Sequence, residues 1–173
     1  HLMVHEWIRT GPFDAAPCLE ATLADLDADR IATFVARARG ARGFPLPEES
    51  TAQEVLTHLN LLDRDRPTHA AVLLFGRQPQ RFLISSEVKC AHFHGSEVTK
   101  PIPSYQVYKG TVFDLVDHAV DFVMSKINLA VGTRERSNQA PVAYEIPPEV
   151  VREAIVNAVA HRDYTNSGSV QVM

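Results

Sequence analysis

The stretch Pro147–Tyr164 reads PPEVVREAIVNAVAHRDY, and its pattern predicts a helix around which the C-terminal half of the chain is organised. Two prolines open it, which suits the first turn of a helix because the φ angle of proline is already helical. At about 100° per residue, one face carries only apolar residues, as expected for a helix that packs on a core. These residues are Val151, Ala154, Ile155, Ala158 and Val159.

A line of polar residues follows a second face of the same helix. Glu153, Asn157 and His161 are spaced by four, which aligns them along the helix axis. Apolar residues, among them Val150 and Val156, flank this line, so it does not read as an ordinary solvated face. A polar line set among apolar residues is a candidate to border a pocket.

The first two residues of this line pair a carboxylate with an amide one helical turn apart. The Asn157 oxygen is a suitable Mg²⁺ ligand, and Glu153 is placed to orient a water for attack on a phosphate. In the structural alternative, Glu153 pairs with Arg152 or Arg162, Asn157 faces solvent, and His161 interacts with the C-terminal helix dipole. Spacing alone favours the structural alternative.

Length and composition are those of a folded globular protein. The chain has 173 residues, of which 45% are hydrophobic and 22% charged. No apolar run reaches the ~18 residues of a membrane helix, and the N-terminus lacks the features of a secretory signal. Cys18 and Cys90 lie far apart, so we expect neither a zinc site nor a disulfide, and a cytoplasmic location. The net charge of −4 does not indicate a nucleic-acid surface.

The N-terminal part predicts two helices. The first covers Asp27–Arg39, with Asp27 as N-cap, and ends at Gly40 and Gly43. The second begins at Ser50, where Ser50 and Gln53 fit a capping box.

Two strands are predicted in the middle of the chain. The apolar run Ala70–Gly76, ended by glycine, is typical of a strand buried on both faces, and we expect it at the centre of a sheet. Val88–Phe93 alternates like a second strand. On that strand His92 and His94 have the spacing of a metal-ligand pair, but without a third ligand we expect no metal site.

A long helix and two further strands complete the expected elements. The helix covers Thr111–Leu129, and its broad apolar stripe predicts burial on more than one side, which includes a subunit partner as one option. Residues 95–109 and the charged stretch Gly132–Gln139 read as loops. Val142–Ile146 and Ser169–Met173 read as strands.

This order predicts one mixed α/β fold, with an N-terminal helical layer followed by a mixed sheet flanked by helices. We expect a connecting arm over residues 1–24, of which 1–3 read as a vector remnant. A helical segment is expected over 25–66, and an α/β domain over 67–173 that holds the 147–164 helix. The last predicted strand stops without a turn or cap, so we expect the natural protein to continue.

The chain resembles a known family in three places. PEVVREAIVNAVAHRDY resembles the REAIVNAIVHRDY segment of bacterial and archaeal transcriptional regulators that are often labelled RecG-like ATP-dependent DNA helicases. Thr68–Phe82 is similar to the family's T-x-A-x-x-L-L-F-G-x-x-P-Q signature, and Val107–Val123 suits its next helix. In the family a Schlafen-type AlbA domain precedes this region and a winged helix often follows it. The resemblance therefore implies the middle of a longer, DNA-linked protein.

The helix of this family is in turn similar to the N-box of GHKL ATPases. The resemblance implies that Glu153 matches the N-box glutamate, a catalytic candidate, and that Asn157 matches the Mg²⁺-binding asparagine. His161 is the other candidate for the nucleotide and Mg²⁺ site. The sequence departs from many GHKL members at Ala160, where they carry a charge. The D-x-G-x-G adenine box and the lid are missing, so the chain would stop at the start of the ATPase motif.

The remaining residues of the HRDY motif, Arg162, Asp163 and Tyr164, are expected to be structural. No Walker A pattern is present, so the helicase label finds no support in these residues. If the full protein binds ATP and Mg²⁺, we expect this fragment to bind them weakly or not at all.

Three functions follow from these observations. The first is the central domain of a transcriptional regulator with part of a GHKL-like nucleotide site, which contacts DNA through other domains. The second is a non-catalytic interaction or dimerisation module that couples an AlbA-type domain to a winged helix. The third is an ATPase in which Glu153 acts as the base. None of the three requires a membrane.

Overall fold

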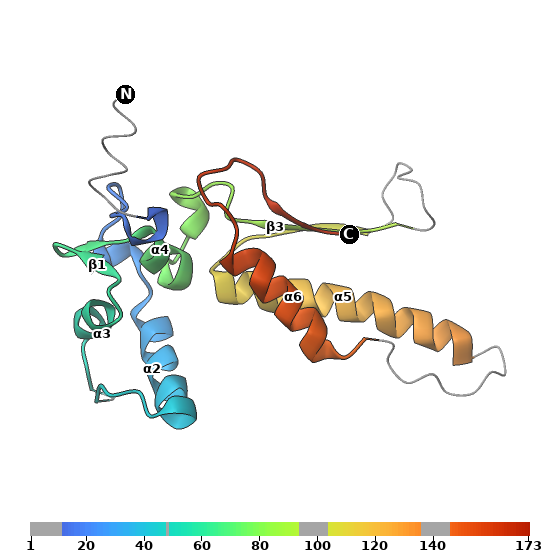
Figure 1. Cartoon of the computed structure of the whole chain (residues 1–173), viewed down its shortest axis with the longest axis horizontal. Coiled ribbons are helices and arrows are strands. Elements are labelled where there is room, and N and C mark those ends of the chain that lie inside the picture. Colours follow the sequence, from blue (N-terminus) through green and yellow to red (C-terminus); the bar gives the residue numbers. More distant parts are fainter. Residues whose placement is uncertain (1–11, 48, 94–103, 136–145) are drawn as a thin grey trace. The chain divides into compact units, whose positions relative to one another are not determined.

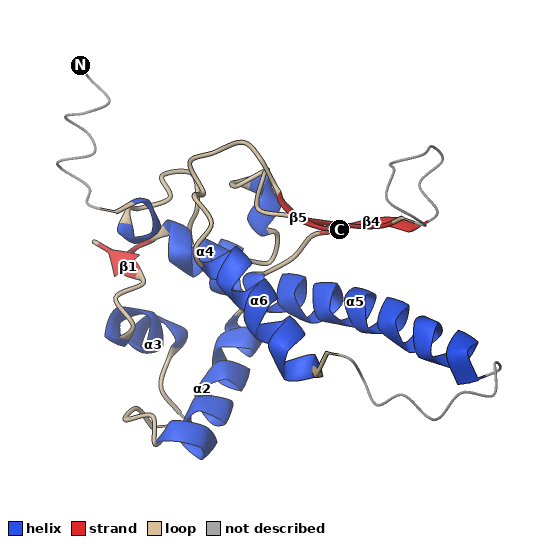
Figure 2. Cartoon of the chain, turned by 45° about the vertical axis from the view of Figure 1, so that its right-hand side comes forward, coloured by secondary structure: helices blue, strands red, loops and turns tan. Residues whose placement is uncertain are grey.

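A computed structural model describes residues 12–47, 49–93, 104–135 and 146–173 (Figure 1). The chain forms two compact units, His1–Ile84 and Ser85–Met173, each with its own buried cluster. Helices and two small sheets give the mixed α/β fold class that the sequence predicts (Figure 2).

The first unit is mainly helical. Its elements are η1 (Phe13–Ala15), η2 (Leu23–Asp25), α2 (Ala28–Arg42), α3 (Ala52–His58), β1 (Leu62–Asp63), β2 (Arg66–Pro67), α4 (His69–Phe75) and η3 (Pro79–Arg81). The described helices meet around a core whose most deeply buried side chains include Ile31, Val35, Val55, Leu56, Val72 and Phe75. The segment before α2 belongs to this body, because Cys18 and Ala21 are buried in the same core.

The second unit is a three-stranded sheet with two helices. Its elements are β3 (Val88–His92), β4 (Ser104–Tyr108), α5 (Val112–Glu135), α6 (Pro148–Ala160) and β5 (Val170–Val172). The strand order is β4-β3-β5, with β4 antiparallel and β5 parallel to β3, so the sheet is mixed as predicted. The two helices lie side by side (Figure 1), and they share a core with Val88 and Cys90 of the central strand.

The predicted first helix is confirmed as α2. Asp27 caps α2 by accepting hydrogen bonds from the backbone N–H groups of Asp29 and Arg30. The helix continues through Gly40 and stops at Gly43, which adopts the left-handed conformation at φ 62° that favours glycine.

The predicted central strand Ala70–Gly76 is wrong, because this run forms helix α4. The Thr68 hydroxyl accepts a hydrogen bond from the Ala71 N–H and so caps the helix. Ala71, Val72, Leu73 and Phe75 are all buried, and a run that is apolar on nearly every side looks the same in a buried helix and a buried strand.

Two other predictions change in detail. The capping box of α3 is formed by Thr51 and Glu54, one residue later than the predicted Ser50 and Gln53. The long helix α5 extends to Glu135, into the stretch predicted as a charged loop. Residues 136–145, which include most of the predicted strand Val142–Ile146, lie outside the described residues.

The division into units also differs from the predicted one, which separated 25–66 from 67–173. The observed boundary falls between Ile84 and Ser85. The reason lies in α4, whose residues are buried in the core of the first unit together with those of α2 and α3.

Candidate functional site

Helix α6 is positioned by a narrow apolar stripe. Val151, Ile155 and Val159 are buried and join the core of the second unit with side chains of α5. Ala154 and Ala158, predicted to share this stripe, are exposed. The contact face is thus a single row at i, i+4 and i+8, which leaves most of the helix circumference open to solvent in the described structure.

The polar line lies on this open side. Glu153 and Asn157 are each two residues from Ile155, which at about 100° per residue places both nearly opposite the buried stripe. Both side chains are exposed, and so is His161, whose backbone N–H donates to the Asn157 carbonyl at 3.0 Å to close the last turn. Val150 beside the line is 53% exposed. The line is therefore an accessible surface carried by a rigid helix.

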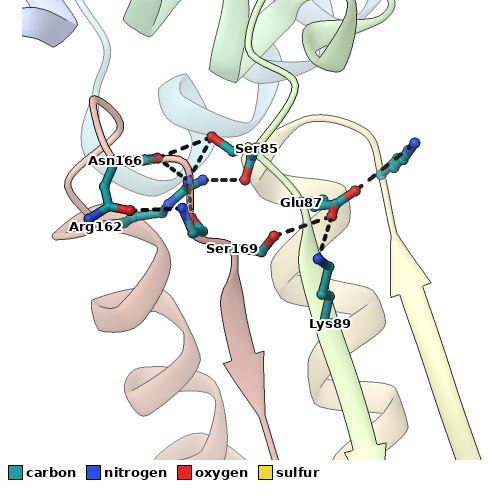
Figure 3. Close-up of polar contacts among 8 residues, drawn as sticks. Ser85, Glu87, Lys89, Arg162, Asn166 and Ser169 are labelled. Carbon is teal, nitrogen blue, oxygen red and sulfur yellow. Dashed lines mark hydrogen bonds and ion pairs between the residues drawn. The ribbon is translucent and has the colours of Figure 1, made fainter.

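Arg162 fastens the end of α6 to two other segments of the second unit (Figure 3). Its guanidinium donates hydrogen bonds to the carbonyl oxygen and to Oγ of Ser85, the latter at 2.9 Å. It also donates to the carbonyl oxygens of Asn166, at 3.1 Å, and Gly168. One planar group thus joins the segment before β3 to the loop that leads into β5.

Tyr164 and Asp163 hold the same turn. The Tyr164 hydroxyl donates to the Val159 carbonyl at 2.8 Å, and the Arg162 guanidinium stacks over its ring. Burial raises the pKa of Tyr164 above its ordinary value. The Asp163 carboxylate accepts from the hydroxyl and the N–H of Thr165, and these hydrogen bonds lower the pKa of Asp163. All three residues make contacts that define the chain path after α6.

Pairings considered from the sequence alone take a different form in the structure. Arg152 pairs with Asp117 of α5, with 2.8 Å between Nη2 and Oδ1. Arg162 uses backbone and hydroxyl oxygens as its hydrogen-bond partners.

Sequence reasoning missed Ser85, Asn166 and Glu87. Glu87 forms ion pairs with Lys89 at 3.2 Å and Lys109 at 4.0 Å, and it accepts a hydrogen bond from Ser169 (Figure 3). Ser85 and Arg162 are 77 residues apart, so no local spacing could have indicated their contact.

Metal ligands and reactive thiols are the other kinds of candidate site in the sequence. Among the described residues, no group of three or more His, Cys, Asp or Glu side chains is arranged to hold a metal. His94 lies outside those residues, so the expectation that His92 and His94 do not form a metal site stays a prediction. Cys18 and Cys90 are both buried free thiols. A search of the described helices finds none with the length and apolar character needed to cross a bilayer.

A surface hollow in the first unit, beside α3, is lined by Leu46, Thr51, Gln53, Glu54, Thr57 and His58. Its polar groups serve local structure: Thr51 and Glu54 form the helix cap, and Gln53 donates to Asp65 of the β1–β2 turn.

One solved structure resembles the chain over 97% of its length, the DIP2311 protein of Corynebacterium diphtheriae, with 22% sequence identity and a TM-score of 0.56. This chain spans 30% of the length of that protein. No protein-family model and no curated protein matches the chain. A likeness at this identity shows the fold alone.

Proposed function

We propose that this chain is the central region of a DNA-linked transcriptional regulator and that α6 supplies one wall of a Mg²⁺–nucleotide site. One observation carries the proposal. Glu153 and Asn157 are both exposed, one turn apart, on the side of α6 opposite its buried stripe.

The donor set of this face suits the proposed ligand. Mg²⁺ keeps several of its waters and binds proteins through one or two oxygens, so the Asn157 amide oxygen is sufficient as a direct ligand. Glu153, one turn earlier, is placed to orient a water towards a phosphate. His161 extends the same line towards the end of the helix and is exposed to solvent.

The anchoring of α6 supports such a role. The buried row on one side and the Arg162 and Tyr164 contacts at the C-terminal end fix the helix, so the polar line is held before any ligand arrives. A preorganised face loses little entropy on binding. In this proposal, other parts of the full protein supply the second wall of the site and the contacts with DNA.

Titration of the full-length protein with Mg-ATP tests the proposal. We expect Asn157→Ala to weaken Mg²⁺-dependent binding by at least about tenfold. If the full protein hydrolyses ATP, Glu153→Ala should abolish turnover while retaining binding. Asp121→Ala, which removes an exposed carboxylate from the neighbouring α5, is the matched control and should leave both properties unchanged.

Residues 1–173 alone should bind Mg-ATP only weakly. Isothermal titration that yields micromolar affinity for these residues would contradict a site divided between α6 and other segments. Absence of Mg-ATP binding by the full-length protein would reject the nucleotide site altogether.

A second candidate function is the non-catalytic interaction module. It is favoured by the apolar side chains Ile146, Val150 and Val156, which are 44%, 53% and 39% exposed on or beside α6. Under this function, Val150→Ser with Val156→Ser weakens assembly of the full protein, whereas Glu153→Ala and Asn157→Ala have no effect on its regulatory activity. The opposite pattern favours the nucleotide site.

A further inference from the structure

Strand β4 is an edge of the described sheet. The strand order β4-β3-β5 leaves one side of β4 without a partner among the described strands. Its middle residues are also open to solvent: Tyr105 is 48% exposed, Val107 is 39% exposed, and Gln106 between them is exposed as well. A strand edge presents unpaired N–H and C=O groups, which form a template for another strand.

The five residues of β4 include none of the usual features that prevent pairing at a sheet edge. Proteins commonly protect edge strands with charged side chains, proline or a bulge. The sequence of β4, Ser-Tyr-Gln-Val-Tyr, has no charge and no proline. Its register with β3 runs from Ser104 to Tyr108 through five consecutive pairs, so no bulge turns the edge away.

We propose that β4 pairs with β4 of a second copy of this chain, antiparallel and centred on Gln106. In a symmetric pair the two-fold axis is perpendicular to the sheet, and opposed side chains lie on one face. A register centred on Gln106 places Tyr105 opposite the partner's Val107 and Ser104 opposite the partner's Tyr108. It is the register that pairs all five residues of β4.

The side chains brought together are complementary. An aromatic residue opposite a β-branched one is a favourable cross-strand pair, and the symmetry forms the Tyr105–Val107 pair twice. The β3 register adds Ala91 beside Tyr105 and Lys89 beside Val107 on the same face. In the joined sheet, Tyr105 and Val107 of each copy therefore contact Val107 and Tyr105 of the other, which reduces their exposure to solvent.

A second copy fits this edge better than a foreign strand. β4 carries no charge that would select an oppositely charged partner, and its sequence is complementary to itself in the proposed register. Two three-stranded sheets would form one continuous sheet of six strands, and the symmetric contact closes on itself instead of propagating. The proposal is independent of nucleotide binding. It assigns dimerisation, one of the functions considered above, to the edge of strand β4.

A charge-swap experiment tests the register. In the proposed dimer, Gln106 lies opposite the partner's Gln106, so Gln106→Lys and Gln106→Glu each place like charges face to face. We expect each variant alone to raise the dimer dissociation constant by about tenfold or more. Mixing the two variants should restore association, because unlike charges then meet. Sedimentation velocity over a concentration series measures all three cases.

The other edge provides the control. Gln171 is the middle residue of β5 and is exposed, and its partner in β3 is Lys89, so Gln171→Glu adds a charge to the opposite edge without placing like charges side by side. This variant should dimerise like the unaltered chain, and circular dichroism checks that each variant folds. A chain that is monomeric up to about 0.5 mM overturns the proposal. Dissociation by Gln171→Glu but not by Gln106→Glu overturns it equally.

A cysteine at the symmetry axis gives a second measurement. Opposed residues of an antiparallel pair have Cα atoms about 4.5–5.5 Å apart, within the range of a disulfide. Gln106→Cys should therefore form a cross-linked dimer on oxidation, whereas Gln171→Cys should not. Cys90 is the cross-strand partner of Gln106 in β3, so both variants are made with Cys90→Ala to prevent a disulfide within one chain. The other native thiol, Cys18, is buried. Failure of Gln106→Cys to cross-link a chain that dimerises would exclude this register.

Discussion

The Arg162 guanidinium joins two stretches of the second unit that are far apart in the sequence. It contacts Ser85 before β3 and Asn166 and Gly168 before β5, while its own backbone follows the end of α6. Arginine suits this position because its planar fork donates several hydrogen bonds in fixed directions. The carbonyl groups of an irregular turn are thereby satisfied without regular secondary structure.

Replacing this side chain should destabilise the second unit. We expect Arg162→Ala to lower the free energy of unfolding by about 2 kcal/mol, since several hydrogen bonds to a charged group are lost. Arg162→Lys should recover only part of this, because an ammonium lacks the fork. Arg152→Ala, which breaks an exposed ion pair with Asp117, should cost at most about 1 kcal/mol. Urea unfolding measures these values, and an equal effect of Arg152→Ala and Arg162→Ala would contradict the role of Arg162.

Cys90 makes stability depend on pH in the alkaline range. Burial on the central strand raises the pKa of its thiol from 9.0 to about 11. The Cys90 thiol therefore keeps its proton to a higher pH in the folded state than in the unfolded state. Its contribution to the free energy of unfolding is fully present below pH 9 and is lost as the pH rises towards 11. We expect the free energy of unfolding to fall over this range, and Cys90→Ala to remove part of that fall. Rapid reaction of Cys90 with a thiol reagent at about pH 8, under native conditions, would contradict its burial.

The candidate site could be predicted from the sequence only where its geometry is local. The i, i+4 relation of Glu153 and Asn157 follows from helical periodicity, and both do lie on one face of α6. The catalytic and binding roles of these two residues stay predictions. The partners of Arg162 could not be found from spacing, because Ser85 is 77 residues away and makes contact through its backbone as well as its hydroxyl.

Two glycines of the first unit differ in the space that surrounds them. Gly76 ends α4, and Gly40 lies inside α2. A Cβ on Gly76 would lie 2.5 Å from the Val72 carbonyl oxygen, at the point where the chain leaves α4. A Cβ on Gly40, inside α2, would meet nothing within 4 Å. The same substitution should therefore change stability in opposite directions at these two positions.

We expect Gly76→Ala to lower the free energy of unfolding by about 2 kcal/mol or more, since backbone atoms must move. Gly40→Ala should raise it by about 0.5–1 kcal/mol, because alanine restricts the unfolded chain and favours the helix. Thermal unfolding of both variants checks the signs. Stabilisation by Gly76→Ala would show that the α4 terminus differs from the conformation described.

The elements themselves were predictable where periodicity and capping residues agree. Asp27 marks the start of α2, and alternation identifies β3. The run 70–76 reads as a strand because a helix buried on most sides loses its periodic signal. Thr68, which caps α4 in the structure, is a residue type that favours N-caps and is the local signal for the helix.

At the scale of the whole molecule, the two cores share no residue. The sequence does not predict the boundary between them, because no change in composition and no linker-like stretch marks the passage from Ile84 to Ser85. Contact between residues distant in the sequence defines the boundary, and such contact has no local signature.

Separate cores should give separate local stabilities. Val35 and Val159 are 2% and 3% exposed, one in each core, so Val→Ala at each position makes a matched pair. Each change should cost about 2 kcal/mol and raise amide hydrogen exchange mainly in its own unit. Mass spectrometry of peptic peptides resolves the two units. Equal acceleration in both units by either variant would show that they unfold as one.

The parallel pairing of β3 with β5 also means that the sheet can be completed only late in synthesis of the chain. Val88 pairs with Val170, a separation of 82 residues, whereas its antiparallel neighbour in β4 is Tyr108, only 20 residues away. At about 5–20 residues per second, the ribosome needs roughly 4–16 s to add β5 after β3. The first unit has by then left the ribosome. During this interval β3 of the nascent chain can pair with β4, but its other edge has no partner until β5 is made.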